Sequence, residues 1–232
     1  MKKKNYEEVF KIMWLLIIGS VFGYIVETLY CSYLQHTFAD RSGTFYLYIS
    51  PIYGLGFVLA YFMLRHDFDH KATDRLNIIR KSTGKMKEVL RFCIDNLYLF
   101  FISGVFGGLF EVVLSYLQEL FFNYRSWNYD GFLSIDGRTN FKMMVIWGVI
   151  GILFVRVIYP LFENALRLIP TNVGNVFCVV IFTAVLFDVL VTSYGTYRYK
   201  LRREGDAASN AIESFFDKTY PDSYVKDFLG AD

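Results

Sequence analysis

The sequence lacks the residues that several common kinds of chemistry require. It contains no Gly-Lys-Ser or Gly-Lys-Thr loop of the kind that cradles nucleotide phosphates. It holds only three histidines and shows no Ser/His or Cys/His set for nucleophilic catalysis, and a net charge of +2 gives no basis for a nucleic-acid partner. We therefore expect no cofactor, favour a non-enzymatic role, and place any ATPase on a separate chain.

Cysteines and histidines are too few and too scattered to predict a metal site. Cys31, Cys93 and Cys178 lie within or beside apolar stretches and far apart in sequence, which is typical of small buried apolar residues rather than of a disulfide. His66 and His70 stand four residues apart, but no third certain ligand accompanies them. We expect neither a metal ion nor a disulfide.

Apolar and aromatic residues are abundant instead. Hydrophobic residues make up 54% of the chain and aromatic residues 19%. A helix needs about 20 apolar residues to cross the hydrocarbon core of a bilayer. Five stretches meet this requirement, and they cover residues 12–34, 46–64, 97–117, 143–161 and 173–194. The sequence therefore predicts an all-α, polytopic membrane bundle over residues 1–195 and a polar tail over residues 196–232.

The distribution of Lys and Arg predicts the orientation in the cell membrane. With a cytoplasmic N-terminus, fourteen basic residues fall inside and four outside across the first four helices, as the positive-inside rule requires. The fifth helix then carries Arg198, Lys200, Arg202 and Arg203 outward, against the same rule. The side on which the C-terminus lies stays open, and a sixth crossing or re-entrant element at residues 160–170 is an alternative.

An apolar stretch that contains a carboxylate occurs twice. SVFGYIVETL, residues 20–29, reappears 84 residues later as GVFGGLFEVV, residues 104–113. Small residues four apart place one close-packing face on each helix, so the carboxylates should face protein rather than lipid. The matched residues are Gly19, Gly23 and Glu27 in the first copy and Ser103, Gly107 and Glu111 in the second. We expect two parallel repeat halves, residues 12–64 and 97–161, with the helix at 173–194 standing outside them.

Three carboxylates are expected at one depth. Glu27, Glu111 and Asp188 each lie roughly 10 Å below the predicted outer ends of their helices, at about 1.5 Å per residue. Arg41 and Arg138 in the outer loops could hold carboxylates bidentately. We predict an acidic pocket that opens outward and is capped by these two arginines. The alternative is that each acid only locks helix packing.

One long motif resembles a known family. WNYDGFLSIDGRTNFKMMVIWGVIGILFVRVIYPLF, with FGYIVET and SPIYGLG earlier in the chain, is similar to the bacterial membrane family described as putative ABC-transporter type IV. The resemblance covers most of residues 12–162 and implies a permease. Trp127 and Tyr129 belong to this motif and join the candidate substrate-binding residues. The chain reads WNY where the family pattern would read WDY.

Three functions are compatible with these features. The first is a transport subunit that binds a small polar or zwitterionic solute and works with a separate cytoplasmic ATPase or as a homo-oligomer. The second is a membrane enzyme acting on a lipid-linked substrate at the outer leaflet, with Glu27 or Glu111 as general base and Arg138 holding the substrate. The third is a scaffold or sensor. The tail reads as two short amphipathic pieces broken at Pro221.

Overall fold

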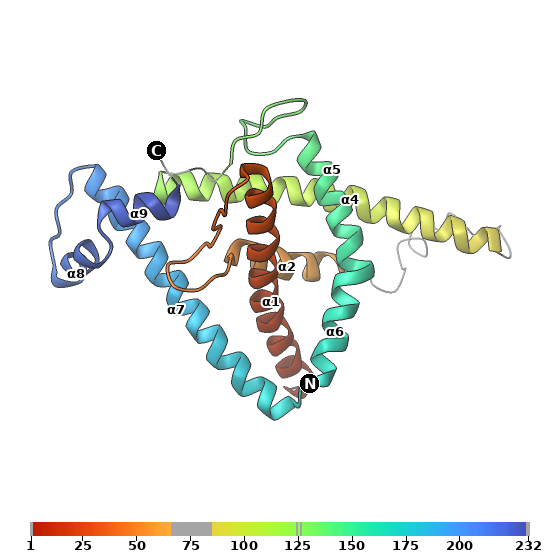
Figure 1. The fold of residues 1–232 in the computed structure, drawn as a ribbon. Helices are drawn as coiled ribbons and strands as arrows, with labels where there is room; N and C mark the ends of the chain where they lie inside the picture. Colours follow the sequence, from red (N-terminus) through yellow and green to blue (C-terminus); the bar gives the residue numbers. More distant parts are fainter. Residues whose placement is uncertain (1, 66–84, 124, 126, 231–232) are drawn as a thin grey trace. The chain divides into compact units, whose positions relative to one another are not determined.

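The computed structural model describes residues 2–65, 85–123, 125 and 127–230, and within these ranges the fold is all-α. Long helices dominate it (Figure 1). In chain order the elements are α1 (Lys2–Gln35), α2 (Pro51–Leu64), α4 (Lys85–Phe122), α5 (Phe141–Leu153), the π-helical turn η1 (Phe154–Ile158), α6 (Tyr159–Leu168), α7 (Thr171–Arg203), α8 (Ala211–Thr219) and α9 (Asp222–Leu229).

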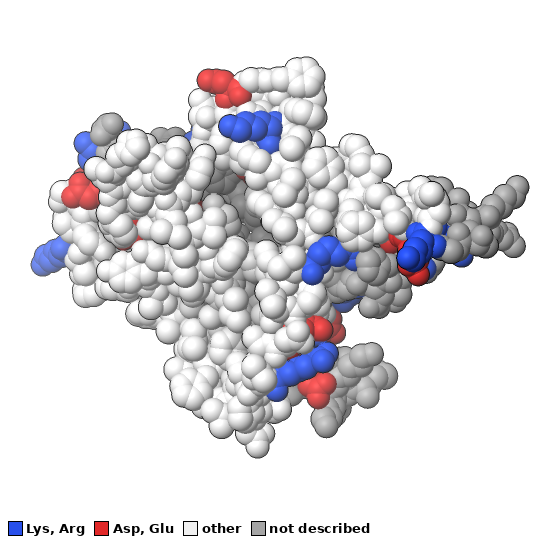
Figure 2. Space-filling model, turned by 45° about the vertical axis from the view of Figure 1, so that its right-hand side comes forward, with Lys and Arg blue, Asp and Glu red and all other residues white. Residues whose placement is uncertain are grey.

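Four helical segments are long and apolar enough to cross a bilayer: Glu7–Gln35, Lys85–Phe122, Phe141–Leu168 and Thr171–Arg203. Many of their exposed residues are apolar, and Phe101, Phe187 and Leu190 are each more than 60% exposed. Most of the surface in Figure 2 is uncharged, with Lys, Arg, Asp and Glu gathered in small groups. A multi-pass membrane protein accounts for this surface, because apolar side chains of this size lose little by facing lipid.

Two of the predicted spans differ from the observed helices. The predicted helix 46–64 begins only at Pro51, where the fixed φ of proline suits the first helical turn. The predicted helix 143–161 is interrupted by η1, and the N–H of Tyr159 bonds to Phe154 O there. Pro160 follows at once in the first turn of α6, and a proline inside a helix removes one hydrogen bond and clashes with the preceding turn.

The chain divides into two compact units, which are described separately. The first unit comprises Met1–Val58 and Pro170–Asp232, and the second comprises Leu59–Ile169. The first unit contains α1, the start of α2, α7 and the tail helices. The second contains the end of α2 and α4 to α6.

Small residues allow close helix contacts in each unit. In the first unit, a Cβ added to Gly23 of α1 would lie 2.2 Å from Tyr53 of α2. In the second unit, a Cβ added to Gly107 of α4 would lie 2.3 Å from Trp147 of α5. Both distances are far below a van der Waals contact, so larger side chains would separate the helices. The other two small residues of the sequence pattern, Gly19 and Ser103, also lie at these contacts, against Phe57 and Gly151.

The tail helices pack on α7 through a buried arginine. Arg198 of α7 is 2% exposed and donates two hydrogen bonds to the Asp217 carboxylate of α8, at 3.1 and 2.7 Å. Arg202 donates to the same carboxylate at 2.6 Å and to Asp222 of α9 at 2.5 Å. Such forked, charge-assisted bonds are among the stronger polar contacts in proteins, so the tail is fastened to α7 at both of its helices.

Candidate functional site

The segment that follows α1 turns back along that helix. The N–H of Arg41 donates to Thr28 Oγ1 at 3.3 Å, and the N–H of Ser50 donates to the carbonyl of Ser20 at 2.9 Å. Ser20 is completely buried. The eight residues from Thr28 to Ser20 correspond to about 12 Å of helix, so the non-helical segment 41–50 runs beside the apolar part of α1 before α2 begins.

Asp188 of α7 holds the middle of this segment. Its carboxylate accepts the backbone N–H of Leu47 at 2.7 Å and that of Tyr46 at 3.2 Å. Next to it, Thr192 accepts the N–H of Phe45 at 2.9 Å. Asp188 is 2% exposed, and a carboxylate in such a position is retained only with hydrogen-bond donors around it. Three consecutive backbone N–H groups are thereby satisfied on one face of α7.

Glu27 holds the start of the same segment. Arg41 Nε lies 3.2 Å from Glu27 Oε1, and their side chains are 36% and 24% exposed. The predicted contact between Arg41 and Glu27 is thus present in the first unit. Because neither group is fully buried, both remain within reach of solvent or a solute.

In the second unit, Glu111 contacts Thr139, the residue that follows Arg138. Glu111 is 5% exposed and accepts a hydrogen bond from Thr139 Oγ1 at 2.7 Å. The next residue, Asn140, caps α5 by accepting the N–H of Met143 at 2.9 Å. The segment before α5 therefore ends directly against the carboxylate of α4.

Arg138 contacts residues near the C-terminal end of α4 rather than Glu111. Among the described residues, its ion pairs are with Glu119 and with Asp136, the latter at 3.1 Å. It also donates to Ser115 Oγ at 2.9 Å, and its guanidinium lies 3.5 Å from the centroid of the Tyr116 ring. The side chain is only 3% exposed. Glu119 is not among the residues predicted from the sequence, although Glu111, Ser115 and Glu119 continue the same four-residue stripe.

Trp127 and Tyr129 brace the backbone around Arg138. Trp127 Nε1 donates to the carbonyl of Arg138 at 2.8 Å, and the N–H of Tyr129 donates to the carbonyl of Gly137 at 2.7 Å. Gly137 has a φ of +69°, and a Cβ there would lie 1.8 Å from Asn128 Oδ1. This turn therefore requires glycine, and it sets the position from which Arg138 reaches α4.

The candidate residues fall into two groups. Glu27, Arg41 and Asp188 lie in the first unit, where the two acids hold different parts of one segment. Glu111 and Arg138 lie in the second unit, and the meeting of all three carboxylates in a single pocket stays a prediction. Within the part of the chain that the structure describes, no group of three or more metal-ligating side chains occurs. His66 and His70 lie outside the described residues.

Comparison with known proteins decides the family. A family model described as putative ABC-transporter type IV matches residues 14–193. The chain belongs to this family. The matched segment contains every candidate residue of both units, while α8, α9 and the last turns of α7 lie beyond it. No curated protein and no solved structure matches the chain.

Proposed function

We propose that this member of the putative ABC-transporter type IV family is a permease-like subunit that binds a small polar or zwitterionic solute at the outer face of the membrane. The observation that carries the proposal is the non-helical segment 41–50, held beside apolar helices by Asp188 and Glu27. In a bilayer, irregular backbone is tolerated only where protein buries it or where it lines a water-filled cavity. Interrupted helical elements with polar backbone are how many transporters build solute sites.

The pair Glu27 and Arg41 offers both signs of charge to a solute. A zwitterion could direct its ammonium group to Glu27 and its carboxylate to Arg41, replacing the 3.2 Å contact that now joins them. The exchange preserves charge-assisted hydrogen bonds on both sides. Partial exposure of both side chains supports this role, since a fully buried ion pair would be costly to open.

The tail supports an outer location for the segment and for the C-terminus alike. Tyr46 of the segment bonds to Tyr220 between α8 and α9, so the tail lies on the same face of the membrane as the loop that follows α1. With a cytoplasmic N-terminus, as the positive-inside rule favours, that face is the outer one. Five crossings satisfy this arrangement, with α2 as the short one.

The energy source would come from another chain. The sequence has no phosphate-cradling Gly-Lys-Ser/Thr loop, and the family description names ABC transporters. We place a separate cytoplasmic ATPase beside this protein, with a homo-oligomer as the alternative assembly. Purification of the tagged chain from its native membranes in a mild detergent, followed by an ATPase assay, tests for this partner.

Uptake by proteoliposomes tests the transport role. Vesicles that contain the native complex are offered a panel of radiolabelled amino acids and other zwitterions. For an accumulated solute, Glu27→Gln and Glu111→Gln should reduce uptake by at least about tenfold, while Glu7→Gln and Glu88→Gln, exposed acids on the same helices, leave it unchanged. Thermal unfolding of each variant shows that the fold is retained. Uptake equal to that of empty vesicles across the panel, or full activity of both acid variants, would contradict the proposal.

A further inference from the structure

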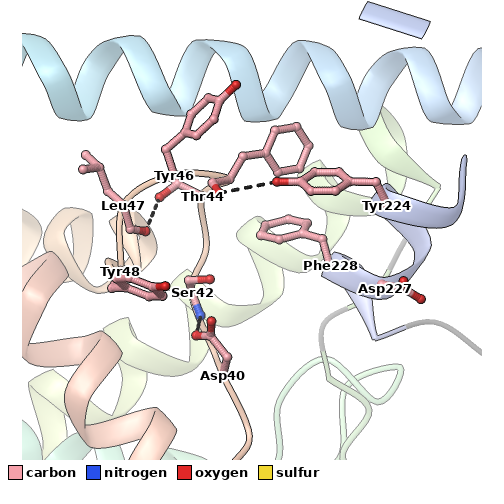
Figure 3. A pocket seen from close by; sticks show the side chains of 10 residues that line it. Asp40, Ser42, Thr44, Tyr46, Leu47, Tyr48, Tyr224, Asp227 and Phe228 are labelled. Carbon is pink, nitrogen blue, oxygen red and sulfur yellow. Dashed lines mark hydrogen bonds between the residues drawn. The ribbon is translucent and has the colours of Figure 1, made fainter. Parts of the chain in front are cut away.

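A pocket of about 280 Å³ lies between the segment after α1 and the tail helix α9, within the first unit. Figure 3 shows its walls. The segment contributes residues from Asp40 to Tyr48, and α9 contributes Tyr224, Asp227 and Phe228. The α9 residues lie beyond the stretch that the family model matches, while the other lining residues belong to the segment after α1, whose backbone Asp188 holds.

Aromatic rings form much of the wall. Five of the ten lining residues are aromatic, namely Phe45, Tyr46, Tyr48, Tyr224 and Phe228. In Figure 3, Tyr48 reaches the pocket from the segment and Phe228 from α9, while the ring of Tyr46 points away toward α7. The Phe45 ring contacts the Tyr224 and Phe228 rings edge-on, with centroids 5.2 and 4.9 Å apart. These contacts fix the α9 rings, whereas Tyr48, whose ring lies 6.0 Å from the Tyr24 ring between centroids, is 69% exposed.

The charges in the pocket are of one sign. Asp40 and Asp227 are the only charged residues among the ten that line it, and none of the ten is basic. Asp40 Oδ1 accepts the N–H of Ser42 at 3.0 Å, which holds the carboxylate at the floor of the pocket in Figure 3. Arg41, the neighbouring cation, is turned to Glu27. The local field therefore favours a cation.

We propose that this pocket binds an organic cation of the alkylammonium class. A cation within about 6 Å of an aromatic face is attracted by the ring quadrupole, and quaternary ammonium groups are recognised by several rings together. The charge would lie between Tyr48 and Phe228 with Asp40 as counter-ion, and the volume suits a group of the size of choline. The ammonium can belong to a free solute or to a lipid headgroup. Binding requires no transport, so it is tested apart from the proposed function.

Calorimetric titration of the purified full chain in a maltoside detergent tests this assignment. The probe is choline, and the comparison is 3,3-dimethylbutanol, in which carbon replaces the charged nitrogen. Saturable binding of choline and at least tenfold weaker binding of the neutral isostere are expected. Binding of both compounds with equal affinity, or no saturable binding of choline up to its solubility in the assay, would overturn the proposal.

Variants locate the binding in this pocket. Tyr48→Leu, Phe228→Leu and Asp40→Asn should each weaken choline binding by about five- to tenfold, the range that cation–π contacts and exposed charge pairs supply. Phe215→Leu on α8 and Asp206→Asn, at positions that do not line the pocket, serve as matched controls. Tyr48 and Asp40 are exposed, so these two variants test binding even if Phe228→Leu loosens α9. Unchanged affinity in Tyr48→Leu and Asp40→Asn would overturn the proposal.

Nanodiscs of two lipid compositions distinguish whether the ammonium group comes from a lipid headgroup or from a soluble ligand. Choline binding is compared in discs of phosphatidylglycerol alone and in discs that also contain phosphatidylcholine. Competition by phosphatidylcholine identifies the lipid headgroup as an occupant, and undiminished binding identifies a soluble ligand. Both results support an alkylammonium site. Loss of choline binding in both kinds of disc would contradict it.

Discussion

The carboxylate of Asp188 accepts the backbone N–H of Leu47 at 2.7 Å, across 141 residues of sequence. The neighbouring N–H groups of Tyr46 and Phe45 bond to Asp188 and Thr192. These contacts satisfy backbone donors that would otherwise be left unpaired beside an apolar helix, at a cost of several kcal/mol in hydrocarbon. Asp188 of α7 thus supplies hydrogen-bond acceptors for the backbone of this irregular segment.

Replacement of Asp188 by Asn should loosen this segment. Asn keeps the shape but removes the charge, and its NH₂ group cannot accept a backbone N–H. Loss of charge-assisted hydrogen bonds of this kind predicts a decrease of about 2 kcal/mol in the free energy of unfolding. Thermal unfolding in nanodiscs measures it, with the exposed Asp206→Asn as the control. Equal stability of the two variants would show that Asp188 does not hold the segment.

Replacement of Arg138 by Gln should destabilise the second unit. The guanidinium is 3% exposed and joins Glu119, Asp136 and Ser115, so its loss predicts a decrease of about 2 kcal/mol in the free energy of unfolding. Arg138→Lys should fall between Gln and the native residue, because an ammonium cannot reproduce the planar fork. Arg167→Gln, at an arginine with 76% of its side chain exposed, is the control. A Lys variant as stable as the native protein would rule out the forked geometry as the source of stability.

Gly107→Ala should destabilise the contact between α4 and α5. In an ordinary helix this exchange stabilises by up to about 1 kcal/mol, whereas here the new Cβ would lie 2.3 Å from the Trp147 ring. Overpacking predicts a decrease of about 1–3 kcal/mol in the free energy of unfolding instead. The double variant Gly107→Ala/Trp147→Ala should show a smaller loss than the sum of the two single variants. A more stable single variant would contradict the close helix approach.

Acid should release the tail. The hydrogen bond from Arg198 lowers the pKa of Asp217 below its ordinary value. A carboxyl with a lowered folded-state pKa stabilises the docked tail fully above its unfolded value of about 3.9, and this contribution disappears as the pH falls through the lowered value. Amide hydrogen exchange in α8 and α9 should therefore be constant from about pH 5 to 8, after correction for intrinsic rates.

The same exchange measurement identifies Asp217 as the group responsible. Asp217→Asn should accelerate exchange in both tail helices already at neutral pH, because Arg198 is then left buried without its main partner. Asp206→Asn should exchange like the native chain. Protection that persists unchanged below pH 3, or in Asp217→Asn, would assign the docking to the aromatic contacts alone.

The sequence predicts the helices better than the contacts between distant residues. Hydropathy locates the apolar stretches, and the four-residue stripe explains why Gly23 and Gly107 face neighbouring helices. It cannot distinguish Tyr46 to Ser50 from the start of a helix, because this stretch is largely apolar and its non-helical form depends on Asp188 far along the chain.

The partner of Arg138 and the pocket beside α9 could not be predicted either, because both depend on contacts between residues that are far apart in the sequence. Glu111 and Glu119 share one helix face, and only the turn at Gly137 decides which of them the arginine reaches. The tail reads as amphipathic from its spacing, yet its docking depends on the Arg198–Asp217 pair and on the ring of Phe45. Such long-range contacts leave no local periodicity in the sequence.

The accessibility of position 47 from outside the cell tests directly whether the segment held by Asp188 opens outward. A chain with Cys31, Cys93 and Cys178 replaced by alanine receives Leu47→Cys, with His36→Cys in the exposed loop and Val180→Cys on the apolar surface of α7 as controls. A membrane-impermeant maleimide added to intact cells should label positions 47 and 36 but not 180. Labelling of position 47 only by a membrane-permeant reagent, or only from the cytoplasmic side, would contradict a polar segment that opens outward beside Asp188.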